Sequence, residues 1–133
     1  MNQPCNTHGA FSWCELLTTD TDAAKQFYGK LFNWTLEPAP ISSPEMEYTL
    51  VKYGSEPSGG MMKIPATAEG MPPHWGVYVT VDDVDSCAKL AVELGGKICL
   101  PPQDIPQVGR FCVLQDPQGA VISIITYLQH CGG

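Results

Sequence analysis

Basic residues are scarce in this chain of 133 residues: 7 Lys and Arg stand against 14 Asp and Glu, a formal net charge of −7. Because a nucleic-acid-binding surface needs an excess of positive charge, this balance argues against DNA or RNA as a partner. The longest apolar stretch, Val121 to Ile125, is far too short to cross a bilayer. The N-terminus has neither the charged nor the apolar region of a secretory signal. We therefore expect a single cytoplasmic domain with no membrane or nucleic-acid partner.

Histidine is also scarce, and the cysteines do not occur in closely spaced pairs. The chain has only 3 histidines, and its 6 cysteines are scattered singly, with no CxxC motif and no zinc-finger spacing. In the reducing compartment expected here, free thiols are predicted for Cys5, Cys14, Cys87, Cys99, Cys112 and Cys131. The alternative is a reactive Cys14, which lies beside Trp13 and Glu15 in the sequence. His8 and His130 fall in termini that we predict to be flexible.

The first positive signal is an internal duplication. Residues 11–18 read as a strand, Asp20 can cap the helix that follows, and apolar residues then recur at helical spacing. The same series returns in residues 76–94, where Asp83 takes the capping position and the glycine pair 95–96 can end the helix. The two series superpose with one constant shift, which is 63 positions (83 − 20 = 63).

Each half of the duplication predicts the order strand, helix, strand, strand, strand. We assign module one to about residues 9–64, a Pro- and Gly-rich linker to 65–73 and module two to about 74–128. Proline-containing loops are predicted at 38–44 and 101–106. The fold class is therefore α+β, in which two βαβββ modules form a curved, incompletely closed mixed β-barrel with a central cleft. Helices cover one face of the sheet, so the functional residues should lie on the face that lines the cleft.

Three features together resemble a known family: the doubled βαβββ order, the helical segment Asp20…Phe27-Tyr28…Leu31-Phe32, and the tail Asp116-Pro-Gln-Gly-Ala-Val121. The chain is similar to the vicinal oxygen chelate superfamily, which includes glyoxalase I, bleomycin-resistance proteins and extradiol dioxygenases. The resemblance covers roughly residues 9–128 and is specific for the fold, not for one activity. It implies a small-molecule ligand and a homodimer, with the cleft near or across the subunit interface.

The resemblance also provides a test for a metal centre. In the family's metalloenzymes, His or Glu/Gln side chains from four strands hold a divalent ion, which acts as a Lewis acid on two neighbouring substrate oxygens. Carried over to this chain, the four positions are Trp13, Gly60, Gly76 and Ser123. Trp and Gly offer no side-chain ligand and a neutral Ser hydroxyl is a weak one, whereas a catalytic metal needs about three good donors. We therefore predict no metal and no other cofactor, and no classical metal-dependent glyoxalase I activity.

Glu15 is the most suggestive residue of the predicted cleft. Strand alternation sends Trp13 and Glu15 to the same face, so a carboxylate lies beside an indole there. Burial would disfavour its charge and make Glu15 a candidate general acid or base, whereas the alternative is that it only accepts structural hydrogen bonds. Tyr78 is the repeat partner of Glu15 (78 − 63 = 15). We predict a hydrogen bond between these two candidate catalytic residues across the barrel.

Further side chains complete the predicted ligand site. Tyr48 and Phe111 are repeat partners (111 − 63 = 48), and Ser123 lies on the floor of the cleft. Met61 and Trp75 are candidate wall residues, although Met and aromatic groups more often build a core. The predicted ligand contacts are Trp13, Tyr48, Met61, Trp75, Tyr78, Arg110, Phe111 and Ser123.

Arg110 is the only arginine of the chain. It either anchors a carboxylate or phosphate of the ligand, or pairs with Asp104 or Asp116 to hold a loop, and the sequence favours neither reading. The acidic run at 82–85 lacks the glycine and the last glutamate of an EF-hand calcium loop, so capping of the second helix explains it better.

Three functions are compatible with these features. The first is metal-independent binding of a small aromatic or amphipathic molecule in the cleft. The second is a metal-independent lyase or isomerase that uses Glu15 as acid or base, with Tyr78 and Arg110 assisting. The third is an interaction module without a small ligand.

Overall fold

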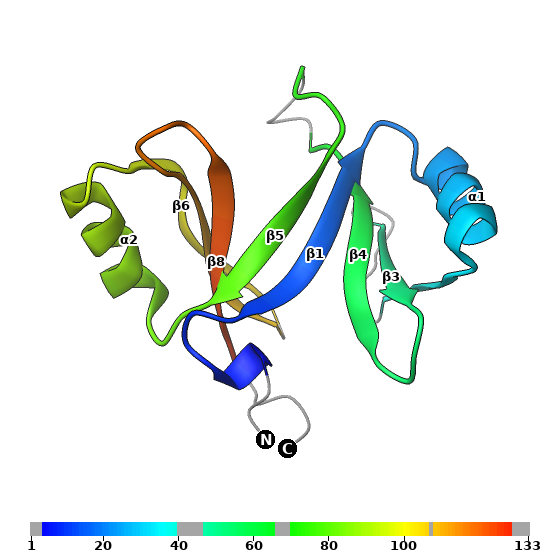
Figure 1. Cartoon of the computed structure of the whole chain (residues 1–133), viewed down its shortest axis with the longest axis horizontal. Helices are drawn as coiled ribbons and strands as arrows, with labels where there is room; N and C mark the ends of the chain where they lie inside the picture. The colour runs from blue at the N-terminus through cyan, green and yellow to red at the C-terminus, as the bar shows by residue number, and fades with distance from the viewer. Residues whose placement is uncertain (1–3, 40–46, 66–69, 107, 129–133) are drawn as a thin grey trace. The chain divides into compact units, whose positions relative to one another are not determined.

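The computed structural model of the chain describes residues 4–39, 47–65, 70–106 and 108–128 (Figure 1). Its elements in chain order are η1 (Pro4–Asn6), β1 (Phe11–Thr18), α1 (Thr21–Phe32), β2 (Thr35–Pro38), β3 (Tyr48–Lys52), β4 (Pro57–Lys63), β5 (His74–Thr80), α2 (Val84–Glu93), β6 (Lys97–Ile105), β7 (Gly109–Gln115) and β8 (Val121–Tyr127). None of the helices in these ranges has the length and apolar character that crossing a bilayer would require.

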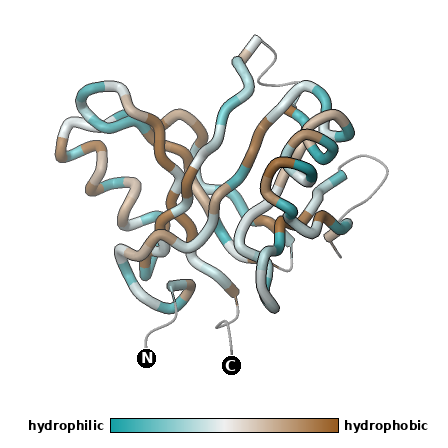
Figure 2. Tube along the Cα trace, turned by 45° about the vertical axis from the view of Figure 1, so that its right-hand side comes forward, coloured by the Kyte–Doolittle hydropathy of each residue, from teal (hydrophilic) through white to brown (hydrophobic). Residues whose placement is uncertain are grey.

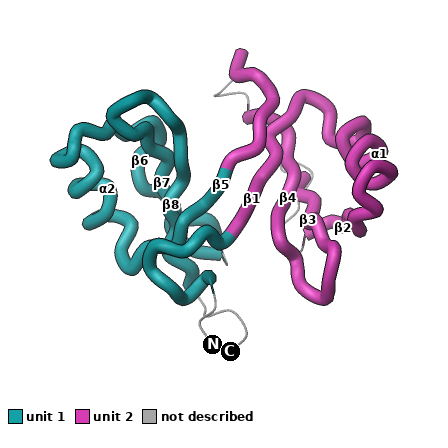
Figure 3. The backbone as a smooth tube through the Cα atoms, in the orientation of Figure 1, with its two compact units in different colours: residues 1–12, 77–133 teal, residues 13–76 magenta. Residues whose placement is uncertain are grey.

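The chain divides into two compact units, which Figure 3 shows in different colours. Unit 2 comprises residues 13–76, and unit 1 comprises residues 1–12 and 77–133. The start of β1 belongs to unit 1, where Gly9 N–H donates to the Thr80 carbonyl (2.7 Å) and Thr80 N–H donates to the Ala10 carbonyl (2.8 Å). The two units therefore differ by a few residues from the modules that the sequence repeat predicts.

Unit 2 contains a mixed sheet in the order β2-β3-β4-β1, in which β1 runs parallel to β4 and the other pairs are antiparallel. Helix α1 begins after Asp20, whose carboxylate accepts a hydrogen bond from Ala23 N–H at 3.0 Å. It ends at Asn33, which adopts the left-handed conformation (φ 59°) common at helix ends. Between α1 and the sheet lies a core of Leu16, Val51 and Met61, packed against Ala24, Tyr28, Trp34 and Leu36.

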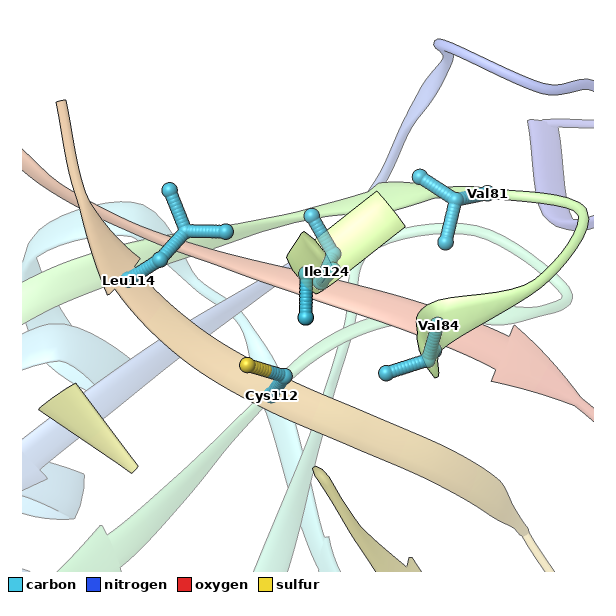
Figure 4. Packing of buried hydrophobic residues seen from close by; sticks show 6 residues of the cluster. Val81, Val84, Cys112, Leu114 and Ile124 are labelled. Carbon is cyan, nitrogen blue, oxygen red and sulfur yellow. The ribbon is translucent and has the colours of Figure 1, made fainter. Parts of the chain in front are cut away.

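Unit 1 repeats this arrangement with the sheet order β5-β8-β7-β6. Asp83 caps α2 by accepting from Ser86 N–H at 3.2 Å, and Gly95 follows the helix with a φ of 97°, as the glycine pair predicted. The core under α2 consists of Val81, Val84, Ala88, Cys112, Leu114 and Ile124. Figure 4 shows several of these side chains around Cys112, and Figure 2 shows hydrophobic and hydrophilic bands alternating along both helices.

Strand pairing confirms the duplication residue by residue. Glu15 pairs with Gly60 in unit 2, and Tyr78 pairs with Ser123 in unit 1. Both members of the pair are therefore shifted by 63 positions (78 − 15 = 63 and 123 − 60 = 63). The mixed strand pairing within each unit, together with its helix, confirms the predicted α+β class and the βαβββ order. The closure of the modules around a cleft stays a prediction.

The loop predicted at 101–106 is wrong, because β6 continues through it to Ile105. Proline has no N–H to donate, and β6 tolerates Pro101 and Pro102 because it is the last strand in the sheet order of unit 1. Register irregularities on both sides of Leu100 accommodate the prolines. Residues 40–44 of the other predicted loop lie outside the described residues.

The cysteines divide into two groups. Cys14, Cys87, Cys99 and Cys112 are free thiols, as predicted. Cys5 is disulfide-bonded, which corrects the prediction for that residue, since spacing in the sequence says little about cysteines that the fold brings together. Cys131 lies outside the described residues. Burial raises the pKa of the Cys87 and Cys112 thiols, so these two are poor nucleophiles, whereas Cys14 is exposed.

Candidate functional site

The sheet face of unit 2 that points away from α1 gathers three of the predicted site residues. Leu16 packs in the core toward α1, and side chains alternate along a strand, so Trp13 and Glu15 of β1 point to the opposite face. Both side chains are half-buried. Tyr48 of β3 reaches the same two residues through its hydroxyl group.

These residues form a directional chain of hydrogen bonds. The Trp13 indole N–H donates to the Tyr48 hydroxyl at 2.9 Å, and the Tyr48 hydroxyl donates to Glu15 Oε2 at 2.7 Å. Because an indole N–H can only donate, the Tyr48 oxygen accepts from it and directs its own proton at the carboxylate. Tyr48 is only 8% exposed, so the packing around its ring fixes the position of the hydroxyl group that joins the two hydrogen bonds.

Gly60 is the residue that leaves room for Tyr48. It pairs with Glu15 between β4 and β1, and a methyl group on its Cα would overlap the hydroxyl end of the Tyr48 ring. A glycine inside a strand often marks such a close approach. The side chain of Tyr48 therefore occupies the space that a larger residue at position 60 would need.

The residues at the four family ligand positions do not fit a metal ion. Trp13 uses its only polar atom as a donor to Tyr48, and the space beside Gly60 is filled by the Tyr48 ring. Gly76 has no side chain and Ser123 offers a neutral hydroxyl. Across the described ranges no group of three or more His, Cys, Asp or Glu residues is arranged to hold a metal. Such a donor set falls short of a catalytic zinc or nickel site.

The corresponding face of unit 1 carries the other predicted aromatic residues. The rings of Tyr78 and Phe111 have their centroids 6.4 Å apart and are tilted by 48°, and Tyr78 pairs with Ser123 between β5 and β8. The structure thus brings these three predicted residues together within unit 1. The hydrogen bond between Glu15 and Tyr78 stays a prediction, and the tyrosine partner of Glu15 within unit 2 is Tyr48.

Arg110 is engaged by two carboxylates of unit 1. Its Nε and Nη2 donate to Asp85 at 2.9 and 3.1 Å, and its Nη1 donates to Asp104 at 3.0 Å. These bonds raise the pKa of Arg110, and the hydrogen bonds from Arg110 lower the pKa of Asp85. Of the two readings of Arg110, the structural pairing is the one observed, with Asp85 in place of Asp116. Asp116 instead accepts from the N–H groups of its own turn.

Met61 and Trp75, the two predicted wall residues, lie in different surroundings. Met61 has no exposed surface and belongs to the core under α1, which argues against contact with a ligand. Trp75 donates through its indole N–H to the Tyr28 hydroxyl at 3.1 Å. It belongs to an aromatic cluster of unit 2 whose members are Phe27, Tyr28, Phe32, Trp34 and Trp75.

Sequence reasoning missed two partnerships that define the site. It placed Tyr48 in the cleft without pairing it with Glu15, and it did not consider Asp85 as the partner of Arg110. The glycine at position 60, inside a strand, was the available signal for the close approach of Tyr48. No sequence signal ties Asp85 to Arg110, since the two residues are 25 positions apart and on different elements.

Comparisons with known proteins agree with this fold. A family model described as the Glyoxalase/Bleomycin resistance protein/Dioxygenase superfamily matches residues 10–124. A Mycobacterium tuberculosis protein named "Putative glyoxylase CFP32" is 42% identical over 120 residues, which cover 90% of this chain and 45% of that protein. The "Anthracycline biosynthesis protein DnrV" of Streptomyces peucetius is 34% identical over 117 residues, covering 88% of this chain and 41% of that protein. The chain thus spans less than half the length of these curated relatives.

Solved structures extend the likeness at low identity. A Streptomyces coelicolor methylmalonyl-CoA epimerase variant matches with a TM-score of 0.66 at 15% identity, over 92% of this chain and 100% of that one. A hypothetical protein from Bacillus halodurans matches with a TM-score of 0.69 at 11% identity, over 96% of this chain and 100% of that one. At such identities the likeness establishes the fold alone.

Proposed function

The chain belongs to the glyoxalase/bleomycin resistance protein/dioxygenase superfamily, and from that premise we propose that it binds a small aromatic or amphipathic molecule without a metal ion. The proposed contact surface is the sheet face of unit 2 that carries Trp13, Tyr48 and Glu15. Tyr78, Phe111 and Ser123 stay predicted contacts on the corresponding face of unit 1.

The observation that carries this proposal is the hydrogen-bonded series from Trp13 through Tyr48 to Glu15. It places a half-buried indole next to a carboxylate that the buried phenol of Tyr48 holds in position, and such a surface suits a flat molecule with one polar group. Three of the positions where relatives with a metal centre would carry ligands lie in this unit, namely Trp13, Gly60 and Gly76. The indole of Trp13 cannot coordinate an ion, and the two glycines have no side chain. Binding therefore has to rest on ring contacts and hydrogen bonds.

Metal-free protein tests the proposal. Chelator-treated protein is screened with a library of flat aromatic compounds, and compounds that bind the native state raise its melting temperature. Because all 3 tryptophans lie in unit 2, quenching of fluorescence alone does not locate a site. Trp13→Phe should abolish the response, whereas Trp75→Phe, a matched change in the aromatic cluster, should keep it. One zinc or nickel ion per purified chain, or a library without a single binder, would contradict the proposal.

The second candidate function is a metal-independent lyase or isomerase with Glu15 as acid or base. The observation that favours it is a carboxylate held by a tyrosine hydroxyl beside an indole, a setting in which proton transfer to a bound molecule is feasible. The test is loss of deuterium from carbonyl compounds labelled at the neighbouring carbon. Glu15→Gln should abolish any such exchange, and a variant with full activity rules this function out.

We also propose a cytoplasmic homodimer. The dimer rests on the family resemblance, and the cytoplasm on the four free thiols, which persist most readily in a reducing compartment, although the disulfide at Cys5 is an exception. Light scattering should give twice the mass of one chain in solution. A monomer at all concentrations would refute the dimer. A protein found only outside the cytoplasm would refute the proposed location.

A further inference from the structure

We infer that the ligand of this site carries a positively charged nitrogen, or an equally strong hydrogen-bond donor, attached to a flat ring. This inference rests on the proposed function and specifies the chemistry of its ligand. It excludes carboxylates and phosphates, which the sequence had left open through Arg110.

The first argument is the polarity of the hydrogen-bonded series. Trp13 can only donate, Tyr48 passes the donation on, and the series ends on Glu15 Oε2. An ionised carboxylate has two oxygens with about four acceptor positions and no proton to give. Whatever else Glu15 contacts, the group that a ligand presents to it must be a donor, because two acceptors facing each other would repel.

The second argument is charge. The half-buried carboxylate of Glu15 accepts from Tyr48 and lies on the same strand face as Trp13, and in such a setting an opposite charge is attracted more strongly than in open water. The face of the half-buried Trp13 ring also attracts cations, because aromatic rings carry negative charge on their faces. The whole chain adds a net charge of −7, which draws cations toward the protein and repels anions.

The third argument concerns Arg110, the residue that the sequence offered as an anchor for an anionic ligand. Arg110 donates to Asp85 through two nitrogens and to Asp104 through a third. Binding a ligand carboxylate would require breaking this network, and the three charged groups together carry a net negative charge (1 − 2 = −1). The guanidinium is therefore occupied in holding α2 to β6 and β7.

The experiment uses three probes with the same ring: 2-naphthylmethylamine, 2-naphthylmethanol and 2-naphthoate. Calorimetry on the full chain measures the affinity of each at neutral pH. We expect the ammonium probe to bind about tenfold tighter than the alcohol or more, as charge-assisted hydrogen bonds do, and naphthoate to bind weakest. Added salt should reduce the difference in affinity between the ammonium probe and the alcohol, because it screens the attraction between charges.

Glu15→Gln should weaken the ammonium probe far more than the alcohol and so remove the preference for the ammonium probe. Glu37→Gln is the matched control, since it removes the same charge from unit 2 at a residue that pairs with Lys52 at 3.0 Å. The Glu37→Gln protein should still bind the ammonium probe more tightly than the alcohol. If Glu15→Gln does not fold, the ¹³C resonance of the Glu15 carboxyl carbon in the native protein should move with the ammonium probe and stay in place with the alcohol.

The outcomes separate the inference from the function on which it rests. Equal binding of the amine and the alcohol, tighter binding of naphthoate, or an unchanged preference in Glu15→Gln overturns the inference and leaves the proposed function standing. Failure of all three probes to bind overturns the inference, and it overturns the proposed function as well if the library of aromatic compounds also contains no binder.

Discussion

The two units place different chemistry at equivalent positions of the same scaffold. In unit 2, Tyr48 donates a hydrogen bond to Glu15 at 2.7 Å. In unit 1 the repeat partners of these residues are Phe111 and Tyr78, whose rings meet at 6.4 Å without the hydroxyl that such a bond would need from residue 111. One pair of positions is charged and hydrogen-bonded, and the other is aromatic on both sides.

The helix-covered faces differ as well. The core under α2 is aliphatic, with Cys112 fully buried, whereas α1 packs with aromatic side chains that belong to a partly exposed cluster. The difference teaches that duplication fixes the backbone and the caps and leaves side-chain chemistry free to diverge. The hydrogen-bonded series from Trp13 through Tyr48 to Glu15 lies in unit 2, whereas the equivalent pair in unit 1 consists of two aromatic rings.

The largest effect is expected from removing equivalent core residues. Met61 and Ile124 are repeat partners (124 − 61 = 63), and each is buried in the core of its unit. Met61→Ala and Ile124→Ala should each lower the free energy of unfolding by about 2–5 kcal/mol, through lost burial and the cavity left behind. Calorimetric unfolding should show one transition that moves in both variants. Two transitions, of which each variant moves only one, would mean that the units unfold independently.

A smaller effect is expected at two glycines that differ in their surroundings. At Gly60 an added methyl group overlaps the Tyr48 ring, whereas at Gly76 nothing lies within 4 Å of it. Gly60→Ala should displace Tyr48, abolish binding of 2-naphthylmethylamine and cost about 1–3 kcal/mol of stability. Gly76→Ala should change stability by less than about 0.5 kcal/mol. Equal behaviour of the two variants in thermal unfolding would remove the reason given for a glycine at position 60.

Removing the hydroxyl group of Tyr48, or adding one at Phe111, tests the hydrogen-bonded pair of Tyr48 and Glu15 directly. Tyr48→Phe leaves the Trp13 N–H without its acceptor and Glu15 without this donor, and because both side chains are half-exposed to water the cost should be about 1 kcal/mol. Phe111→Tyr adds the hydroxyl to unit 1, where residue 78 is no carboxylate, and should stay within about 0.5 kcal/mol. Urea unfolding measures both. A Phe111→Tyr protein that binds the ammonium probe more tightly would contradict the assignment of the site to unit 2.

The smallest effect concerns the ion pairs of the helices. Arg110 lowers the pKa of Asp85 from its ordinary value of 3.8, so the pair stabilises the protein fully above that value and loses its contribution as the pH falls through the lower, folded-state pKa. The difference in melting temperature between wild type and Asp85→Asn should be constant above about pH 5 and shrink below about pH 4. Asp22→Asn removes the repeat partner of Asp85 (85 − 22 = 63), which lies 3.8 Å from Lys25, and should have the smaller effect near neutral pH. If the difference in melting temperature between wild type and Asp85→Asn instead grew as the pH falls, the pair with Arg110 would not be the source of the stability.

Much of the fold could be predicted because its signals are local. The capping carboxylates Asp20 and Asp83 accept from the N–H three residues later, with the predicted shift of 63 between them (83 − 20 = 63). Strand β1 covers the predicted residues 11–18. The strand through Pro101 and Pro102 could not be predicted, because a proline is tolerated there only by the position of β6 at the end of the sheet.

The sequence predicted which residues of β1 share a face, but it did not predict their hydrogen-bond partners. Alternation along β1 placed Trp13 and Glu15 on one face, but which tyrosine reaches Glu15 depends on how β3 lies relative to β1, with β4 between them. The same holds for Arg110, whose partner Asp85 comes from a helix packed across the sheet. For Met61 the sequence left open a core position and a ligand contact, and its burial follows from the face of β4 that the helix covers.

The most direct test of the central claim uses the three indole N–H resonances of the protein. Trp13 belongs to the proposed site, whereas Trp34 and Trp75 belong to the aromatic cluster. In ¹H–¹⁵N spectra, 2-naphthylmethylamine should move the Trp13 indole signal and leave those of Trp34 and Trp75 in place. A Trp13 signal that stays unchanged while either of the other two moves would contradict a ligand site on the Trp13, Tyr48 and Glu15 face.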